Sequence, residues 1–163
     1  MPNKQLLLLA LDDSPTLQLM KRALSAAKYE LVNVQDSKGL QKNLERSSPA
    51  LILIGEQFAG EEGLRLCGEM LERLPTLPIL LYSEKNTARL AREALKAGLS
   101  GILIPPLHTE DISEAVEGSL ARARRLGDWL RHEVKRTTSS LEERARLSEA
   151  DLARYEAILS TLQ

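Results

Sequence analysis

The sequence has little of the chemistry that metal sites and common catalytic sites require. A single cysteine, Cys67, excludes an internal disulfide and a cysteine-based zinc site. The two histidines, His108 and His132, have no second histidine or cysteine at a metal-binding spacing, so we expect both on the surface. The sequence contains no Gly-rich phosphate loop, no Ser–His–Asp set and no CxxC pair. These absences favour a protein that is not an enzyme.

Long apolar stretches and excess charge are also missing. No run approaches the about 20 apolar residues that a membrane span needs. The leucine-rich run at residues 6–11 lacks a cleavage site and leads into acidic residues, so it is a poor signal peptide. We therefore expect a cytoplasmic protein that binds no membrane. A net charge of −1 gives no reason to expect a nucleic-acid partner.

Short apolar runs alternate with amphipathic stretches along most of the chain. The apolar runs predict strands at residues 5–11, 29–34, 50–54, 78–82 and 101–104. The amphipathic stretches predict helices at residues 14–27, 36–44, 61–74 and 87–97, and from residue 111 onward. Ser14 is expected to cap the first helix, with Pro15 at its first position. Strict alternation predicts a parallel sheet covered by helices on both faces, with functional groups at the carboxyl ends of the strands.

The ends of the predicted strands carry acidic residues, a hydroxyl, glycines and prolines: Asp12, Asp13, Gly55, Gly63, Ser83, Pro105 and Pro106. This layout resembles the receiver domains of response regulators over about residues 5–120. The resemblance implies an α/β fold with a doubly wound, five-stranded parallel sheet of the flavodoxin-like type, in strand order 2-1-3-4-5. It also implies that Asp12 and Asp13 are the acidic pair that holds Mg²⁺, and that Ser83 is the switch hydroxyl.

The resemblance fails at the residues that carry phosphoryl chemistry. The phosphoacceptor aspartate of the family falls at Gly55, and the lysine after the fifth strand falls at Pro105. Phosphoryl transfer to a carboxylate needs a nucleophile, a divalent cation and a counter-charge. Glu56 is a poor substitute, because a shift of one residue along a strand turns the side chain to the opposite face. Gly55, Ser83 and Pro105 are therefore predicted to form a degenerate phosphorylation site.

The acidic pair has two interpretations that the sequence leaves open. Without a third carboxylate, Asp12 and Asp13 would hold Mg²⁺ weakly, through water. Alternatively, they cap the first helix and favour its positive end. No other cofactor is expected. The Pro105-Pro106 bond is cis in the family by resemblance, although trans stays open.

A receiver domain would end near residue 122, so we assign residues 1–122 to it and residues 123–163 to a helical extension. Apolar or small residues at spacings of three and four predict a seam that pairs two copies as a coiled coil. The predicted seam consists of Leu120, Ala123, Gly127, Leu130, Val134, Thr137, Leu141, Ala145, Ser148, Leu152, Tyr155, Leu159 and Leu162. The alternative is a helix that breaks at residues 137–140 or folds back on its own domain. Parallel and antiparallel pairing are both left open.

The predicted function is a non-phosphorylatable, receiver-like signalling module. It would act by protein interaction or as a homodimer, and relay to an output domain through the C-terminal helix. Residues 152–163 resemble the helix that precedes PAS sensor modules, in proteins that often end in cyclic-di-GMP enzymes, so the chain is expected to be part of a larger signalling protein. One alternative is an active phosphoacceptor that uses Glu56. Another is a small-ligand sensor, with Glu84 favouring a cation or amine in a pocket emptied at Gly55.

Overall fold

The computed structural model describes residues 4–85, 87–143 and 157–158, and their side chains except at residues 138–143. The chain divides into two units, Met1–Ala123 and Arg124–Gln163. Within the described residues, no helix has the length and hydropathy needed to cross a bilayer.

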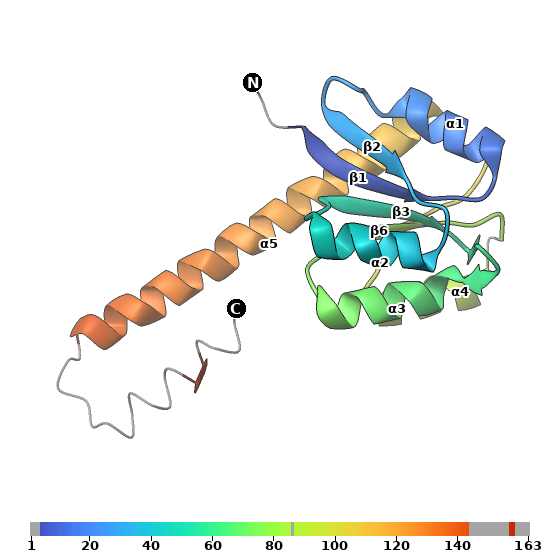
Figure 1. Ribbon diagram of the computed structural model, residues 1–163. Coiled ribbons are helices and arrows are strands. Elements are labelled where there is room, and N and C mark those ends of the chain that lie inside the picture. The colour runs from blue at the N-terminus through green and yellow to red at the C-terminus, as the bar shows by residue number, and fades with distance from the viewer. Residues whose placement is uncertain (1–3, 86, 144–156, 159–163) are drawn as a thin grey trace. The chain divides into compact units, whose positions relative to one another are not determined.

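The first unit is built on a five-stranded parallel sheet (Figure 1). The strands are β1 (Gln5–Ala10), β2 (Tyr29–Asn33), β3 (Leu51–Gly55), β6 (Ile79–Tyr82) and β7 (Gly101–Leu103). Their order across the sheet is β2-β1-β3-β6-β7. Counted along the chain, this is the predicted order 2-1-3-4-5, so the predicted fold class is confirmed.

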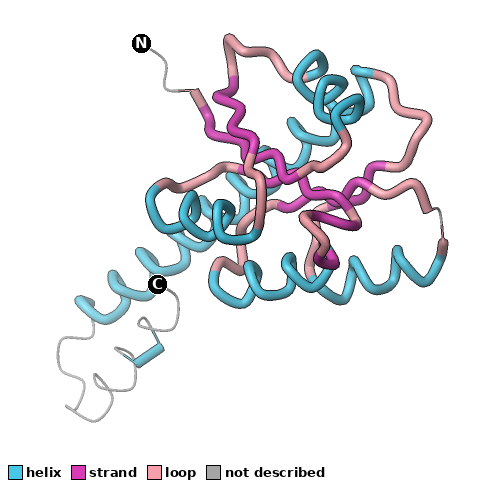
Figure 2. The backbone as a smooth tube through the Cα atoms, turned by 45° about the vertical axis from the view of Figure 1, so that its right-hand side comes forward, coloured by secondary structure: helices cyan, strands magenta, loops and turns pink. Residues whose placement is uncertain are grey.

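Helices cover both faces of this sheet (Figure 2). They are α1 (Ser14–Ala23), α2 (Ser37–Arg46), α3 (Gly63–Arg73), α4 (Ala88–Ala97) and α5 (Thr109–Glu143). Side chains of α2, α3 and α4 share one hydrophobic cluster, and those of α1 and α5 share the other. Leu8 on β1 belongs to the first cluster and its neighbour Leu7 to the second, because successive side chains of a strand point to opposite faces.

The first helix differs from its prediction at both ends. Asp13 rather than Ser14 is the N-cap, since its carboxylate accepts a hydrogen bond from the backbone N–H of Thr16 at 3.2 Å. Ser14 therefore occupies the first helical position and Pro15 the second. The helix ends at Ala23, earlier than predicted, with Lys21 and Arg22 in its last turn.

A short antiparallel hairpin follows the third strand of the sheet and was not predicted. It consists of β4 (Gln57–Phe58) and β5 (Glu61–Glu62). Between them the chain turns at Ala59 and Gly60, which have φ values of 52° and 80°. The fully buried Phe58 anchors the hairpin to the core. The predicted helix over residues 61–74 consequently begins two residues later, at Gly63.

The last helix begins on the sheet and continues into the second unit. Ile112, Val116 and Leu120 of α5 are buried in the core of the first unit, so Leu120 belongs to that core and not to the pairing seam. The helix is continuous through residues 137–140, and the predicted break there is wrong. Leu141 lies within α5, but its side chain is outside the description. Leu152, Tyr155 and Leu159 also lie outside the described residues.

Candidate functional site

A pocket of about 370 Å³ lies at the carboxyl ends of β1, β3 and β6. This is the edge of the sheet where a doubly wound fold places its functional groups. Its lining includes Asp12, Asp13, Gly55, Glu56, Ser83 and Lys85. A second cavity, of about 390 Å³, lies between α2 and α3, and it contains none of the residues that the sequence singled out.

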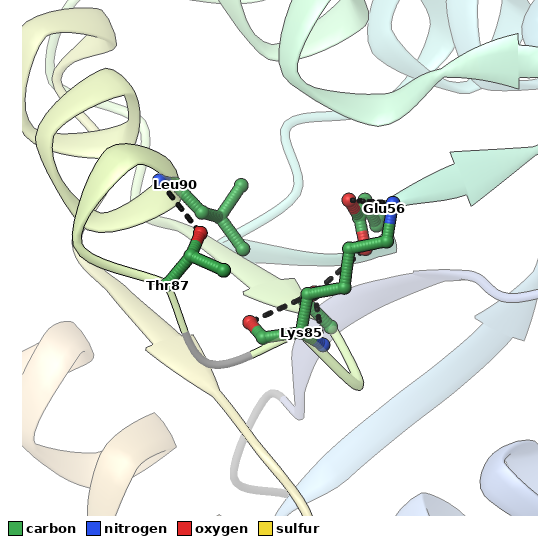
Figure 3. A network of polar contacts seen from close by, with 5 residues as sticks. Glu56, Lys85, Thr87 and Leu90 are labelled. Atoms are coloured by element: carbon green, nitrogen blue, oxygen red, sulfur yellow. Dashed lines mark hydrogen bonds and ion pairs between the residues drawn. The ribbon is translucent and has the colours of Figure 1, made fainter.

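Three residues form a polar network in the first pocket, which we call the Glu56 network: Glu56, Ser83 and Lys85. The Ser83 hydroxyl donates to a Glu56 carboxylate oxygen at 2.7 Å, and Lys85 Nζ lies 3.6 Å from the other oxygen. The backbone N–H of Lys85 donates to Ser83 Oγ at 3.0 Å. Figure 3 shows the Lys85 side chain extending across to Glu56. The Ser83 side chain is buried and Glu56 is 24% exposed, whereas Lys85 is 72% exposed, so the hydrogen bond is shielded from solvent and the ion pair is not.

Sheet register explains why Glu56 meets Ser83. Gly55 pairs with Tyr82 where β3 and β6 run in parallel, so the next residues along both strands lie side by side. Glu56 follows the last residue of β3, and its backbone N–H still donates to the carbonyl of Tyr82 at 2.8 Å. The strand alternation no longer governs its side chain there. The expectation that Glu56 faces away from the pocket is therefore wrong.

The acidic pair at the end of β1 has backbone and side-chain partners of its own. The Asp12 carboxylate accepts from the backbone N–H of Ala59 at 2.9 and 3.2 Å, which ties it to the β4–β5 hairpin. The Asp13 carboxylate accepts from the N–H and the hydroxyl of Thr16. The capping role considered for Asp13 is confirmed.

These two carboxylates do not make a complete Mg²⁺ site. Within the described residues, no group of three or more histidine, cysteine, aspartate or glutamate side chains is placed to hold a metal ion. Mg²⁺ requires near-ideal octahedral geometry from oxygen ligands. Asp12 and Asp13 are instead committed to different structural partners. The residues present therefore do not fit the metal that the family's acidic pair implies.

Gly55, the last residue of β3, packs against Gly63, the first residue of α3. A Cβ atom added at Gly63 would lie 2.0 Å from the carbonyl oxygen of Gly55, a distance that no side chain tolerates. The Gly63 N–H also donates to the Glu56 carbonyl at 2.7 Å. Gly63 thus begins α3 in close contact with Gly55, which ends the buried strand without a side chain.

The cation of the pocket comes from a residue that the sequence reasoning missed. Pro105 and Pro106 are exposed and joined by a cis peptide bond, and neither lines the pocket. Lys85, two residues after Ser83 in the loop before α4, supplies the positive charge beside Glu56. The resemblance places the family's lysine after the fifth strand, where the chain has Pro105. A lysine so close to a strand-end serine was the signal available in the sequence.

The fold and the pocket together define a receiver of the doubly wound α/β type. The family model for the response regulator receiver domain matches residues 7–117. The chain therefore belongs to the response regulator receiver domain family. The predicted resemblance is confirmed over this segment.

Curated relatives agree with this membership. A two-component response regulator of Arabidopsis thaliana, ARR21, is 28% identical over 69% of this chain and 18% of its own length. The transcriptional regulatory protein ZraR of Salmonella typhimurium is 34% identical over 47% of this chain and 18% of its own length. The chain thus spans about a fifth of the length of these relatives.

Solved structures show the same fold at low sequence identity. The receiver domain protein (CheY-like) of Methanospirillum hungatei superposes with a TM-score of 0.68 at 18% identity, covering 76% of this chain and 98% of that one. NtrX from Brucella abortus superposes with a TM-score of 0.69 at 19% identity, covering 82% of this chain and 34% of that one.

Proposed function

We propose that this receiver domain signals without being phosphorylated, and that its C-terminal helix pairs two copies and relays their arrangement to an output module. The observation that carries the first part is the Glu56 network. An internal carboxylate already holds the buried hydroxyl and the cation of the pocket, while Gly55 has no side chain to act as the acceptor.

The pocket lacks a free nucleophile for phosphoryl transfer. Asp12 and Asp13 accept hydrogen bonds from the hairpin and from α1, which draw charge from their oxygens and hold them away from the acceptor position at Gly55. Glu56 is likewise held by Ser83 and Lys85. The counter-charge that would stabilise the transferred phosphoryl group is thereby engaged before any donor arrives.

Glu56 is also the basis of the second candidate function, an acceptor that has moved by one residue. Its position beside Ser83 and Lys85 favours this candidate, because those are the groups that an acyl phosphate on Glu56 would contact. The two candidates make opposite predictions for one measurement, the intact mass of the protein after exposure to a phosphodonor.

The test is incubation of the full chain with acetyl phosphate and Mg²⁺, followed by intact-mass spectrometry. We expect an unchanged mass for the wild-type chain and for Glu56→Gln. A phosphoryl adduct on the wild type that disappears in Glu56→Gln would establish the second candidate instead. An adduct that persists in Glu56→Gln would place the acceptor elsewhere, and it would also contradict the proposal.

The relay to an output module is supported by the relatives. The matched segment makes up 18% of ZraR and 37% of ExaE, a transcriptional activator protein of Pseudomonas putida, so most of each of these proteins lies outside the segment that this chain matches. In this chain α5 extends from the receiver domain into the second unit as one continuous helix. A continuous helix is a stiff connection through which an arrangement at one end is imposed on the other.

A further inference from the structure

The stretch of α5 from Ala123 to Thr137 has one face with a regular spacing. Half-buried residues at intervals of four, three, four and three form this face, which we call the α5 seam: Ala123, Gly127, Leu130, Val134 and Thr137. Such spacing defines a heptad pattern in which Gly127 and Val134 occupy a positions and Leu130 a d position. Glu133 is also half-buried and lies beside this face, at a g position of the heptad. The α5 seam is the surface that the proposed dimer would use.

The residue types along the α5 seam suit one particular arrangement. Within parallel coiled coils, a β-branched residue at a with leucine at d favours two strands over three or four, and Val134 with Leu130 follows this rule. Thr137 also fits a buried seam, because its hydroxyl donates to the carbonyl of Glu133 at 2.9 Å within the same helix. It would therefore enter an interface without an unsatisfied polar group.

Charges beside the α5 seam discriminate between the two directions of pairing. The e positions of the heptad are Arg124 and Arg131, and the g position between them is Leu126. In an antiparallel pair, e positions lie beside e positions of the second copy. Both e positions of this stretch are arginine, so an arginine would lie beside an arginine. In a parallel pair, Arg131 lies beside Leu126 of the second copy, and its aliphatic stem covers that exposed leucine.

We infer that two copies of this chain pair through the α5 seam in parallel and in register, with Arg131 of each copy packed over Leu126 of the other. This inference rests on the proposed dimer and adds its direction and alignment. Parallel and antiparallel pairing differ in whether a seam residue lies beside the same residue of the second copy. In register, each seam residue meets itself, whereas in an antiparallel pair only a residue at the centre does.

Disulfide trapping of the full chain tests this directly. Ala123→Cys, Leu130→Cys and Thr137→Cys would be oxidised separately, at sites that span about 21 Å of helix. The native thiol does not compete, because Cys67 is fully buried and burial raises the pKa of Cys67 to about 12. His132→Cys, at an exposed position opposite the seam, is the matched control.

We expect all three seam variants to form covalent dimers and the control to stay uncrosslinked. Light scattering on the unmodified chain separates the two possible failures. A monomer would refute the proposed dimer and this inference together. A dimer in which one seam variant or none crosslinks would leave dimerisation standing but overturn parallel, in-register pairing, as would equal crosslinking of the control.

Discussion

At the scale of single residues, the hydrogen bond between Ser83 and Glu56 joins the ends of two neighbouring strands. The Ser83 hydroxyl is buried, so leaving it without an acceptor costs free energy, and the carboxylate supplies that acceptor. Lys85 in turn balances the carboxylate charge at 3.6 Å. The segment between β6 and α4 thereby contacts Glu56 twice, through the Ser83 hydrogen bond and the Lys85 ion pair.

A double-mutant cycle measures this coupling. For Glu56→Ala and Ser83→Ala, we expect an interaction energy of about 1 kcal/mol from urea unfolding of the two single variants and the double variant. Partial exposure of the carboxylate keeps the value at the lower end for a charged hydrogen bond. Glu84→Ala, an exposed carboxylate that lines the same pocket, is the control for loss of charge. Strict additivity of the two single changes would show that the network contributes nothing to stability.

At the scale of elements, the β4–β5 hairpin determines where α3 begins. The hairpin ends at Glu62, and Gly63 starts the helix in contact with the Gly55 carbonyl. The Asp12 carboxylate accepts a hydrogen bond from the backbone N–H of Ala59, in the turn of the hairpin. The hairpin therefore connects the ends of β1 and β3, which are the strands that carry the acidic pair and the vacant acceptor position.

Two glycines of α3 offer a matched pair of substitutions. Gly63→Ala should lower the free energy of unfolding by about 2 kcal/mol or more, because its Cβ would overlap the Gly55 carbonyl. Gly68→Ala should raise it by about 0.5–1 kcal/mol, because its Cβ meets no atom within 4 Å and alanine favours the helix. Chemical denaturation of the two variants and of the unmodified chain measures both changes in the free energy of unfolding. Equal effects of the two substitutions would contradict the close approach at Gly63.

The regular elements were predictable from the sequence, and the short ones were not. A strand such as β1 repeats its pattern over several residues and is buried on both faces, so its apolar run identifies it. A two-residue strand such as β4 has no period to detect, and the positive φ of Ala59 is unusual for a residue other than glycine.

The prediction of the pocket was correct in part, and its error has a related cause. It placed Gly55, Asp12, Asp13 and Ser83 correctly at one edge of the sheet, because that position follows from topology. It missed the orientation of Glu56, which depends on how the chain leaves β3 after its last ladder residue. Periodicity within a strand carries no information about the first residue beyond it.

At the scale of the whole molecule, the core is complete before the second unit begins. Both hydrophobic clusters draw on residues no later than Leu120, and they cover the two faces of the sheet. Among the described side chains, the remainder of α5 adds no residue to either cluster. The stability of the first unit should therefore be independent of the helix that follows.

A chain that ends at Ala123 tests this independence. We expect it to unfold cooperatively with the same midpoint as the full chain at a concentration where both are monomeric, because its core is intact. We also expect it to stay monomeric in light scattering at concentrations where the full chain dimerises, since it lacks most of the α5 seam. A large drop in the thermal midpoint would show that the later part of α5 contributes to the core, and a persistent dimer would assign pairing to another surface.

The negative charge in the pocket is the Glu56 carboxylate, which is part of the polypeptide, and this determines when the charge is present. A phosphoryl group is added by one enzyme and removed by hydrolysis, so its occupancy records the balance of two rates. The Glu56 carboxylate belongs to the polypeptide, next to Gly55, and occupies its position from the moment the chain folds. Under the proposed function, what varies in the cell is then the number of copies, and pairing by mass action would make the output follow protein abundance, which synthesis and degradation set.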